Sequence, residues 1–282
     1  MMDIFYSIVN YGLEHTEKLP YSKFKHSYRL PIEYHFDEDL TVEYVSKYWI
    51  LSVPIAIFYL IGIFQLKSFM NKRKPYKLNH LLTLWNGLLA IFSFIGLYRI
   101  SEEVFFVTKN EGIYTSICQS FSVGSVSAFW YIFFGLSKFI ELGDTILLAL
   151  KKRHLTFLHC YHHAIVLVYT WQSGSEQIGA GRWFIWMNFL AHSLMYTYFT
   201  AMSLNIKWVK KYAFYVTTVQ ILQMIIGIVI STSTYFIKTF TKHKCQQSYF
   251  NLYFCFSIYL SFAILFVRFF VKAYYSKKVK TN

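Results

Sequence analysis

The sequence predicts an all-α, polytopic membrane protein with seven transmembrane helices, and three observations support this fold class. Hydrophobic residues make up 55% of the 282 residues and aromatic residues 21%, with a mean hydropathy of +0.35, which is too apolar for a soluble domain. Several stretches reach the roughly 18 apolar residues that suffice to cross a bilayer. Loops rich and poor in basic residues alternate, as expected of a chain that crosses a membrane repeatedly.

Each apolar stretch predicts one helix. The expected spans, in chain order, are 48–66, 80–97, 116–137, 155–171, 183–204, 212–236 and 248–271. The third continues towards residue 150, although 144–150 could instead form a separate short helix. Residues 1–47 lack the apolar core of a signal peptide, so we expect them to form a polar N-terminal tail. One domain, 48–275, follows, and residues 276–282 form a second tail.

The basic residues predict the orientation. The segments 67–77, 151–153, 207–211 and 272–280 hold fifteen Lys and Arg, whereas the intervening connections hold six. The positive-inside rule places the rich side in the cytosol, so the N-terminus is expected to be lumenal and the C-terminus cytosolic. We therefore assign the net charge of +14 to helix ends that contact anionic lipid, and not to nucleic-acid binding.

The C-terminal lysines and two cysteines fit this orientation. Lys278 and Lys280 resemble a dilysine retrieval signal, which predicts the endoplasmic-reticulum membrane. Cys118 and Cys245 both fall on the expected lumenal side, an oxidising compartment, so we hypothesise that they form a disulfide. Two unpaired buried thiols are the alternative.

Four sets of polar residues recur at helical spacing inside apolar segments, where ionisable groups are costly and usually functional. They are Lys138, Glu141, Asp144 and Thr145; His159, His162 and His163; Asn188, His192 and Tyr196; and Thr217, Gln220 and Gln223. The three histidines, at i, i+3 and i+4, share one helical face and serve no packing purpose. A Lys–Glu pair or a Thr/Gln row can instead be purely structural, as a buried ion pair or as interhelical hydrogen bonds.

Imidazole can act as nucleophile, base or metal ligand, so the residue type alone does not decide the chemistry. The HxxHH box is similar to those of membrane di-iron desaturases and hydroxylases, but the further histidine boxes of those families are missing. A single zinc ion would lack an HExxH-type base. A seven-helix transporter or receptor is the non-enzymatic alternative, and no internal repeat supports a transporter.

The four sets together closely resemble the ELO family, the fatty acid elongases of very-long-chain synthesis. The motifs K-x-x-E-x-x-D-T, H-x-x-H-H, H-x-x-M-Y-x-Y-Y and T-x-x-Q-x-x-Q stand here in order, except that Phe199 replaces the last tyrosine of the third. The surroundings of the first motif and the turn near Gly179 and Gly181 resemble the branch acting on saturated and monounsaturated chains.

This resemblance implies an enzyme that condenses a long-chain acyl-CoA with malonyl-CoA, giving 3-oxoacyl-CoA, CO2 and CoA without a metal or other cofactor. Separate reductases and a dehydratase would complete each cycle as partners. The seven helices would surround a substrate tunnel closed towards the lumen, with CoA at the cytosolic mouth. The sequence leaves the oligomeric state open, a homo-oligomer included.

The histidines can supply the chemistry of such a condensation. We hypothesise that His162 attacks the acyl thioester to give an acyl-imidazole, while His159 and His163 orient or deprotonate it. His192, with Tyr196 and Asn188, would hold the malonyl thioester and its enolate. If His162 and His192 served only as general base and oxyanion donor, condensation would proceed without an acyl-enzyme.

The remaining polar residues are expected to bind or position substrate. Basic side chains would hold CoA phosphates or the malonyl carboxylate, namely Lys138, Lys151, Lys152 and Arg153. Glu141 and Asp144 would position the helices or orient Lys138. Thr217, Gln220 and Gln223 are predicted to line the substrate site. Acyl-chain length should depend on the residues at the closed end of the tunnel.

Overall fold

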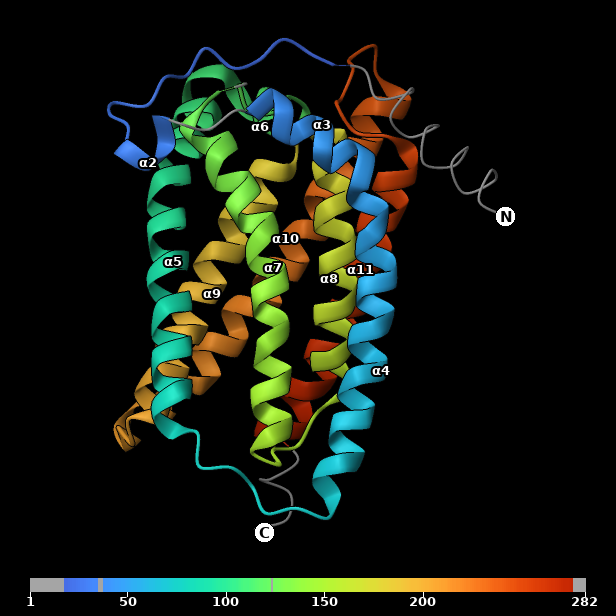
Figure 1. Ribbon diagram of the computed structural model, residues 1–282. Helices are drawn as coiled ribbons and strands as arrows, with labels where there is room; N and C mark the ends of the chain where they lie inside the picture. Colours follow the sequence, from blue (N-terminus) through green and yellow to red (C-terminus); the bar gives the residue numbers. More distant parts are fainter. Residues whose placement is uncertain (1–17, 35–37, 123, 276–282) are drawn as a thin grey trace.

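The computed structural model describes residues 18–34, 38–122 and 124–275, and every element in this part of the chain is helical, with no strand. The predicted all-α class is therefore confirmed. Within this part, seven helices of 20 residues or more stand side by side in one bundle (Figure 1). These are α4 (Ser52–Asn71), α5 (Asn79–Phe106), α7 (Val126–Leu150), α8 (Phe157–Glu176), α9 (Gly181–Ser203), α10 (Ala213–Phe240) and α11 (Tyr249–Phe270). Shorter helices precede or connect them, namely α2 (Pro31–Tyr34), α3 (Glu38–Tyr48) and α6 (Gly112–Cys118).

Four helices, counted with their helical extensions over the described residues, are long and apolar enough to cross a membrane: Thr41–Asn71, Asn79–Cys118, Lys207–Phe240 and Tyr249–Tyr275. Their outer faces are apolar, since side chains such as Phe58 and Phe94 are 71% and 65% exposed. Such exposure would be unusual in water and is ordinary in lipid. The structure therefore supports a membrane protein, and the count of seven crossings stays a prediction.

The basic connections lie together at one end of the bundle. The connections α4–α5 and α7–α8 share this end with the basic turn Lys207–Tyr212 that precedes α10 (Figure 1). Lys152 Nζ donates hydrogen bonds to the carbonyl oxygens of Asn71 and Arg73, each at 3.2 Å. These bonds tie the α7–α8 connection to the α4–α5 connection, so the basic residues form one surface.

The prediction of a third helix beginning at residue 116 is wrong. Helix α6 ends at Cys118, and α7 begins only at Val126, where Ser125 Oγ accepts a hydrogen bond from the backbone N–H of Ala128 at 3.1 Å. The break includes Gly124 at φ +69°, a conformation that glycine adopts without steric cost. Helix α7 then continues unbroken to Leu150, so 144–150 is not a separate helix.

The N-terminal segment is attached to the bundle. Residues 18–34 cross the end opposite the basic connections (Figure 1). The buried Glu33 carboxylate accepts hydrogen bonds from Arg99 Nε at 3.0 Å, Arg99 Nη2 at 2.8 Å and Trp130 Nε1 at 2.8 Å. A bidentate, charge-assisted pair of this kind ties α2 to α5 and α7. The expected polar tail therefore supplies buried contacts.

Glycines let the bundle helices approach closely. The ring of Phe189 on α9 lies against Gly96 of α5, where an added Cβ would be 2.5 Å from the ring atom Cζ. The ring of Tyr259 on α11 covers Gly227 of α10 in the same way. Small residues at helix contacts are the usual means of close packing in membrane bundles.

Candidate active site

The polar sets of the first three motifs meet where α7, α8 and α9 face one another. Helix α8 begins after Thr156, whose Oγ1 accepts a hydrogen bond from the backbone N–H of His159 at 3.2 Å. This cap places the histidine box in the first two turns of α8. Asn188, His192 and Tyr196 are buried on α9 at intervals of four residues, which is one face of that helix.

Lys138 and Glu141 form a buried ion pair on α7. Lys138 is only 3% exposed, and its Nζ donates to Glu141 Oε1 at 2.7 Å and to Asn188 Oδ1 at 3.1 Å. The same Glu141 oxygen lies 3.6 Å from His192 Nδ1. One carboxylate therefore faces both a lysine and a histidine, and the pairing offsets the cost of burying each charge. Lys138 does not lie with Lys151, so the structure separates it from the basic end of the bundle.

Asp144 links α5, α7 and α9. Its Oδ1 accepts a hydrogen bond from Trp85 Nε1 at 2.6 Å, and its Oδ2 accepts one from Tyr196 OH at 2.7 Å. The indole of Trp85 lies against Gly143, where an added Cβ would be 2.6 Å from the ring. His163 Nε2 lies 4.0 Å from Asp144 Oδ2. The carboxylate thus holds the helix that carries Tyr196 against the histidine box.

The three histidines of α8 are neighbours with different surroundings. The ring centroids of His159 and His163 are 4.5 Å apart, and those of His162 and His163 are 5.6 Å apart. His159 Nε2 lies 2.9 Å from Thr145 Oγ1, which in turn lies 2.6 Å from Tyr59 OH. His159 is therefore held by α7 and α4, which suits a positioning role.

His162 has a free ring nitrogen inside the bundle. Its Nδ1 is buried without a hydrogen-bond partner, and its ring centroid lies 4.8 Å from that of Phe262 on α11. Burying a polar atom without a hydrogen-bond partner costs free energy, and a bound ligand that supplies the missing hydrogen bond would explain it. An imidazole in this position can act as a nucleophile or as a general base towards a bound substrate.

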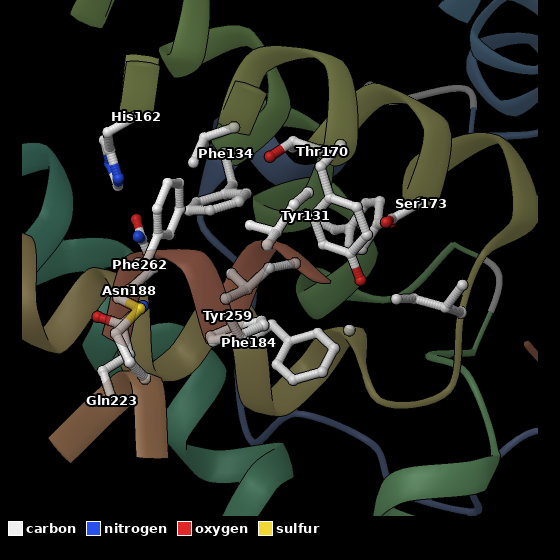
Figure 2. A pocket seen from close by; sticks show the side chains of 17 residues that line it. Tyr131, Phe134, His162, Thr170, Ser173, Phe184, Asn188, Gln223, Tyr259 and Phe262 are labelled. Atoms are coloured by element: carbon white, nitrogen blue, oxygen red, sulfur yellow. The ribbon is translucent and has the colours of Figure 1, made fainter. Parts of the chain in front are cut away.

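A narrow pocket of about 60 Å³ extends from His162 along the interior of the bundle. Asn188 and Gln223 stand with His162 at one side, and Tyr131 and Ser173 stand towards the other (Figure 2). Most of the remaining lining is aromatic or aliphatic, including side chains of α7, α9 and α11. An apolar pocket with a few polar groups at one end is the usual form of a site for a largely hydrocarbon ligand. The pocket is nearly filled by its own side chains, so it must widen to admit a long chain.

The structure does not bring every predicted residue to this pocket. Thr217 Oγ1 donates to the carbonyl oxygen of Ala213 at 3.0 Å within α10, and Gln220 Nε2 lies 3.3 Å from Met195 Sδ. Of that set, Gln223 alone is among the residues that line the pocket within the described chain. The basic connection lies at the end of the bundle, where Lys151, Lys152 and Arg153 follow α7. Lys278 and Lys280 lie outside the described residues.

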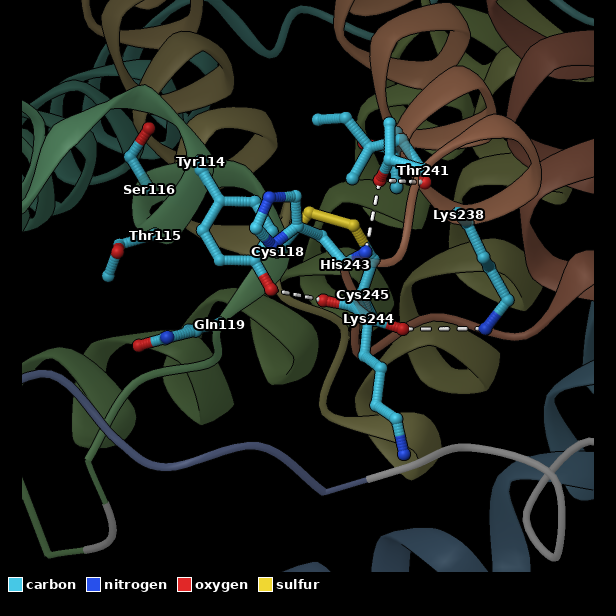
Figure 3. Close-up of a disulfide and its surroundings, with 12 residues drawn as sticks. Tyr114, Thr115, Ser116, Cys118, Gln119, Lys238, Thr241, His243, Lys244 and Cys245 are labelled. Carbon is cyan, nitrogen blue, oxygen red and sulfur yellow. Dashed lines mark hydrogen bonds between the residues drawn. A yellow bond between two sulfur atoms is a disulfide. The ribbon is translucent and has the colours of Figure 1, made fainter.

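Cys118 and Cys245 are joined by a disulfide (Figure 3). Cys118 ends α6, which lies at the end of the bundle opposite the basic connections (Figure 1). The bond links the end of α6 to the segment before α11, two positions separated by 127 in the sequence. The backbone N–H of Gln246 donates to Cys118 O at 2.9 Å, and that of Gly179 donates to Gln246 O at 2.8 Å. Three connections are therefore fastened together at this end.

In the described part of the chain, no three His, Cys, Asp or Glu side chains are arranged to hold a metal ion. The histidine nitrogens are directed to different partners, since His159 contacts a threonine and His192 approaches a glutamate.

Two residues of the site were not singled out from the sequence. Trp85 donates to Asp144, and Tyr59 contacts Thr145. Buried Trp and Tyr side chains usually have a hydrogen-bond partner. This rule applies to all of them, so the sequence alone could not identify Trp85 and Tyr59 as residues of the site.

Known proteins are similar to this chain over most of its length. Residues 44–282 match the model of the ELO family, described as the GNS1/SUR4 family. Putative fatty acid elongase 4 of Caenorhabditis elegans is 46% identical over 272 residues, which cover 96% of this chain and 93% of that protein. Human very long chain fatty acid elongase 3 is 38% identical over 253 residues (89% of this chain, 93% of the relative). Human very long chain fatty acid elongase 6 is 36% identical over 252 residues (89% and 94%). The chain described here belongs to the ELO family.

Proposed function

We propose that this protein condenses a long-chain fatty acyl-CoA with malonyl-CoA to give 3-oxoacyl-CoA, CO2 and CoA. The observation that carries the proposal is the position of His162, which has an unpartnered buried nitrogen at the end of a narrow apolar pocket. The relatives named as fatty acid elongases support the reaction class. The apolar pocket then receives the acyl chain, and the polar residues of α7 and α9 face the reacting carbons.

The first half-reaction transfers the acyl group to His162. A ring nitrogen attacks the thioester carbonyl, the carbon–sulfur bond breaks, and the CoA thiolate leaves with the proton released by the ring. The product is an acyl-imidazole held in the pocket. His163, beside His162 and 4.0 Å from Asp144, is placed to orient the ring and carry the proton.

The second half-reaction forms the carbon–carbon bond. Malonyl-CoA loses CO2, and the resulting enolate carbon attacks the acyl carbonyl as the bond to His162 breaks. The imidazolate released from the acyl group takes up one proton from solvent, because its own proton left with the first CoA, and the enzyme returns to its starting state. Asn188 lines the pocket and accepts a hydrogen bond from Lys138, and His192 lies 3.6 Å from Glu141 one turn further along α9. These two residues can stabilise the enolate oxygen. CoA is bound at the basic end, beside Lys151, Lys152 and Arg153.

The proposal includes the cellular setting. Seven helices cross the endoplasmic-reticulum membrane, with the N-terminus in the lumen and the basic end and C-terminus in the cytosol. The 3-oxoacyl-CoA product requires reductases and a dehydratase as functional partners before the next cycle.

A direct assay tests the proposal. Protein purified in detergent is incubated with labelled malonyl-CoA and a panel of acyl-CoA substrates of graded length, and the product is identified by mass spectrometry. Wild type should form 3-oxoacyl-CoA, whereas His162→Ala should form none while keeping its thermal unfolding temperature. His243→Ala is the matched control, because His243 is exposed near the opposite end of the bundle.

Two results would overturn the proposal. One is a folded wild-type protein that consumes no malonyl-CoA with any acyl-CoA of the panel. The other is stoichiometric iron or zinc that is lost together with activity in His162→Ala, because the histidine would then be a metal ligand.

A further inference from the structure

A second apolar space lies beside the His162 pocket, on the other side of Tyr131. This groove has a volume of about 400 Å³ and runs between α3, α4, α7 and α8. Its rim includes exposed apolar side chains such as Tyr48, Leu51 and Ile55. The volume of this groove is several times that of the pocket of about 60 Å³ that starts at His162.

Two side chains line both spaces. Tyr131 on α7 and Thr170 on α8 belong to the walls of the His162 pocket and of the groove. Tyr131 also lines a small third cavity of about 30 Å³ near Val45 and Gly174. A side chain that lines two adjoining spaces separates them. Tyr131 has a larger side chain than Thr170, so it forms most of this partition.

The ring of Tyr131 is held in place by glycines on two neighbouring helices. An added Cβ at Gly181 would be 3.2 Å from Tyr131 Cε2, and one at Gly174 would be 3.5 Å from Cε1. The ring also packs edge-to-face on Phe121, with the centroids 5.8 Å apart. It therefore lies across the interior, between the end of α8 and the start of α9 (Figure 2).

Tyr131 stands where the far end of a long acyl chain would lie. Thr170 and Ser173 follow His162 by eight and eleven residues on α8, which corresponds to about 12–16 Å along the helix axis. An extended chain advances about 1.2 Å per bond, so a straight acyl group on His162 reaches this level after roughly ten to thirteen carbons. Longer chains must pass Tyr131 or be excluded.

We infer that Tyr131 is a specificity-determining residue that closes the acyl pocket against the side groove and so limits the length of the acyl chain. The inference rests on the proposed function and adds the residue that sets its chain-length range. Truncation of Tyr131 joins the pocket to the groove, whose apolar wall then receives the methyl end of chains that wild type rejects.

Product lengths test this inference. Tyr131→Ala should raise kcat/KM for the acyl-CoA substrates just above the wild-type limit, relative to the best wild-type substrate, by about tenfold, a discrimination typical of one methylene in an apolar pocket. Tyr131→Phe keeps the ring and should leave the profile unchanged. Leu136→Ala, which enlarges the groove away from the partition, is the matched control and should also leave it unchanged.

A second substitution tests the groove itself. Gly135 lines the groove, and an added Cβ there meets Thr170 only at 3.8 Å, so a larger side chain can occupy this space. Gly135→Leu in the Tyr131→Ala background should reverse the gain for longer chains. An unchanged length profile in an active Tyr131→Ala protein would overturn the inference, and so would a gain that Gly135→Leu leaves intact.

If Tyr131→Ala is folded but inactive, photolabelling can show where the methyl end of the acyl chain lies. An acyl-CoA with a diazirine at its methyl end should label peptides of α8 and α9 in wild type and the segment Tyr48–Ile55 in Tyr131→Ala. Labelling confined to α8 and α9 in both proteins would contradict the inference. If wild type itself condenses no acyl-CoA, it is the proposed function that fails.

Discussion

Lys138 and Glu141 show how single residues at this site depend on each other. Both side chains are buried, and the 2.7 Å contact between Nζ and Oε1 leaves each charge compensated by the other. Removing one partner of a buried pair leaves the other charge unpaired inside the bundle, which typically costs about 3–5 kcal/mol.

A double-mutant cycle should reveal this dependence. Lys138→Met and Glu141→Gln should each lower the unfolding temperature in detergent, and the double variant should lose clearly less than the sum of the two. The pair Thr217→Val and Thr218→Val, at positions on α10 away from the pocket, serves as the control for additivity. Strictly additive losses for Lys138 and Glu141 would mean that the two charges do not stabilise each other.

At this scale the sequence identified the charged and imidazole residues of the site but not their aromatic partners. Ionisable residues are rare inside apolar segments, so Lys138, Asp144 and the histidines stand out. Trp85 and Tyr59 do not, because the chain holds 7 Trp and 24 Tyr, most of them expected at lipid or packing positions. Their roles follow only from how α4 and α5 pack on α7.

The short helix α2 shows what a single element contributes to the end of the bundle. Burial alone would raise the pKa of Glu33, but hydrogen bonds from Arg99, the Leu30 backbone and Trp130 outweigh burial and hold this pKa below its ordinary value. A carboxyl group with a lower pKa in the folded state stabilises the fold above its unfolded-state pKa of about 4.3. That stabilisation is lost as the pH falls through the lower, folded-state value.

The pH dependence of stability should therefore report on α2. The difference in unfolding temperature between wild type and Glu33→Gln should be constant from pH 7 to pH 5 and shrink below about pH 4.3. Glu102→Gln is the matched control, because Glu102 is partly exposed and lies 3.9 Å from Arg99. A Glu33→Gln difference that does not change with pH would show that the carboxylate charge plays no part.

Hydropathy located most of the long helices but not their interruptions. The segment from residue 119 to residue 125 is mostly Gln, Ser and Gly, but it is short and stands between apolar stretches, so a window average extends a helix across it. The capping hydrogen bond at Ser125 and the positive φ of Gly124 end that continuity, and they depend on local geometry. The buried position of Glu33 could not be predicted either, because its partner Arg99 is 66 residues away in the sequence and the two meet only in the folded chain.

At the scale of the whole molecule, the basic connections lie at one end of the bundle and the disulfide at the other (Figure 1, Figure 3). This separation is what the alternation of basic loops predicts for a chain that crosses the membrane repeatedly. The course of the acyl pocket could not be predicted, because it depends on which side chains, Tyr131 among them, project into the space between packed helices.

Cysteine accessibility should report this orientation. In sealed microsomes, a membrane-impermeant maleimide should label Lys74→Cys from the cytosolic side and label Lys242→Cys only after detergent is added. The two positions lie in connections at opposite ends of the bundle. Equal labelling of both positions before detergent, or the reverse pattern, would contradict the proposed topology.

The central claim is that His162 carries the acyl group, and trapping that group is the most direct test. Purified protein is incubated with acyl-CoA in the absence of malonyl-CoA, quenched, digested and analysed by mass spectrometry. The account predicts an acyl adduct on His162 that disappears when malonyl-CoA is added and is absent from His162→Ala. An adduct on another residue, or full turnover by His162→Ala, would contradict it.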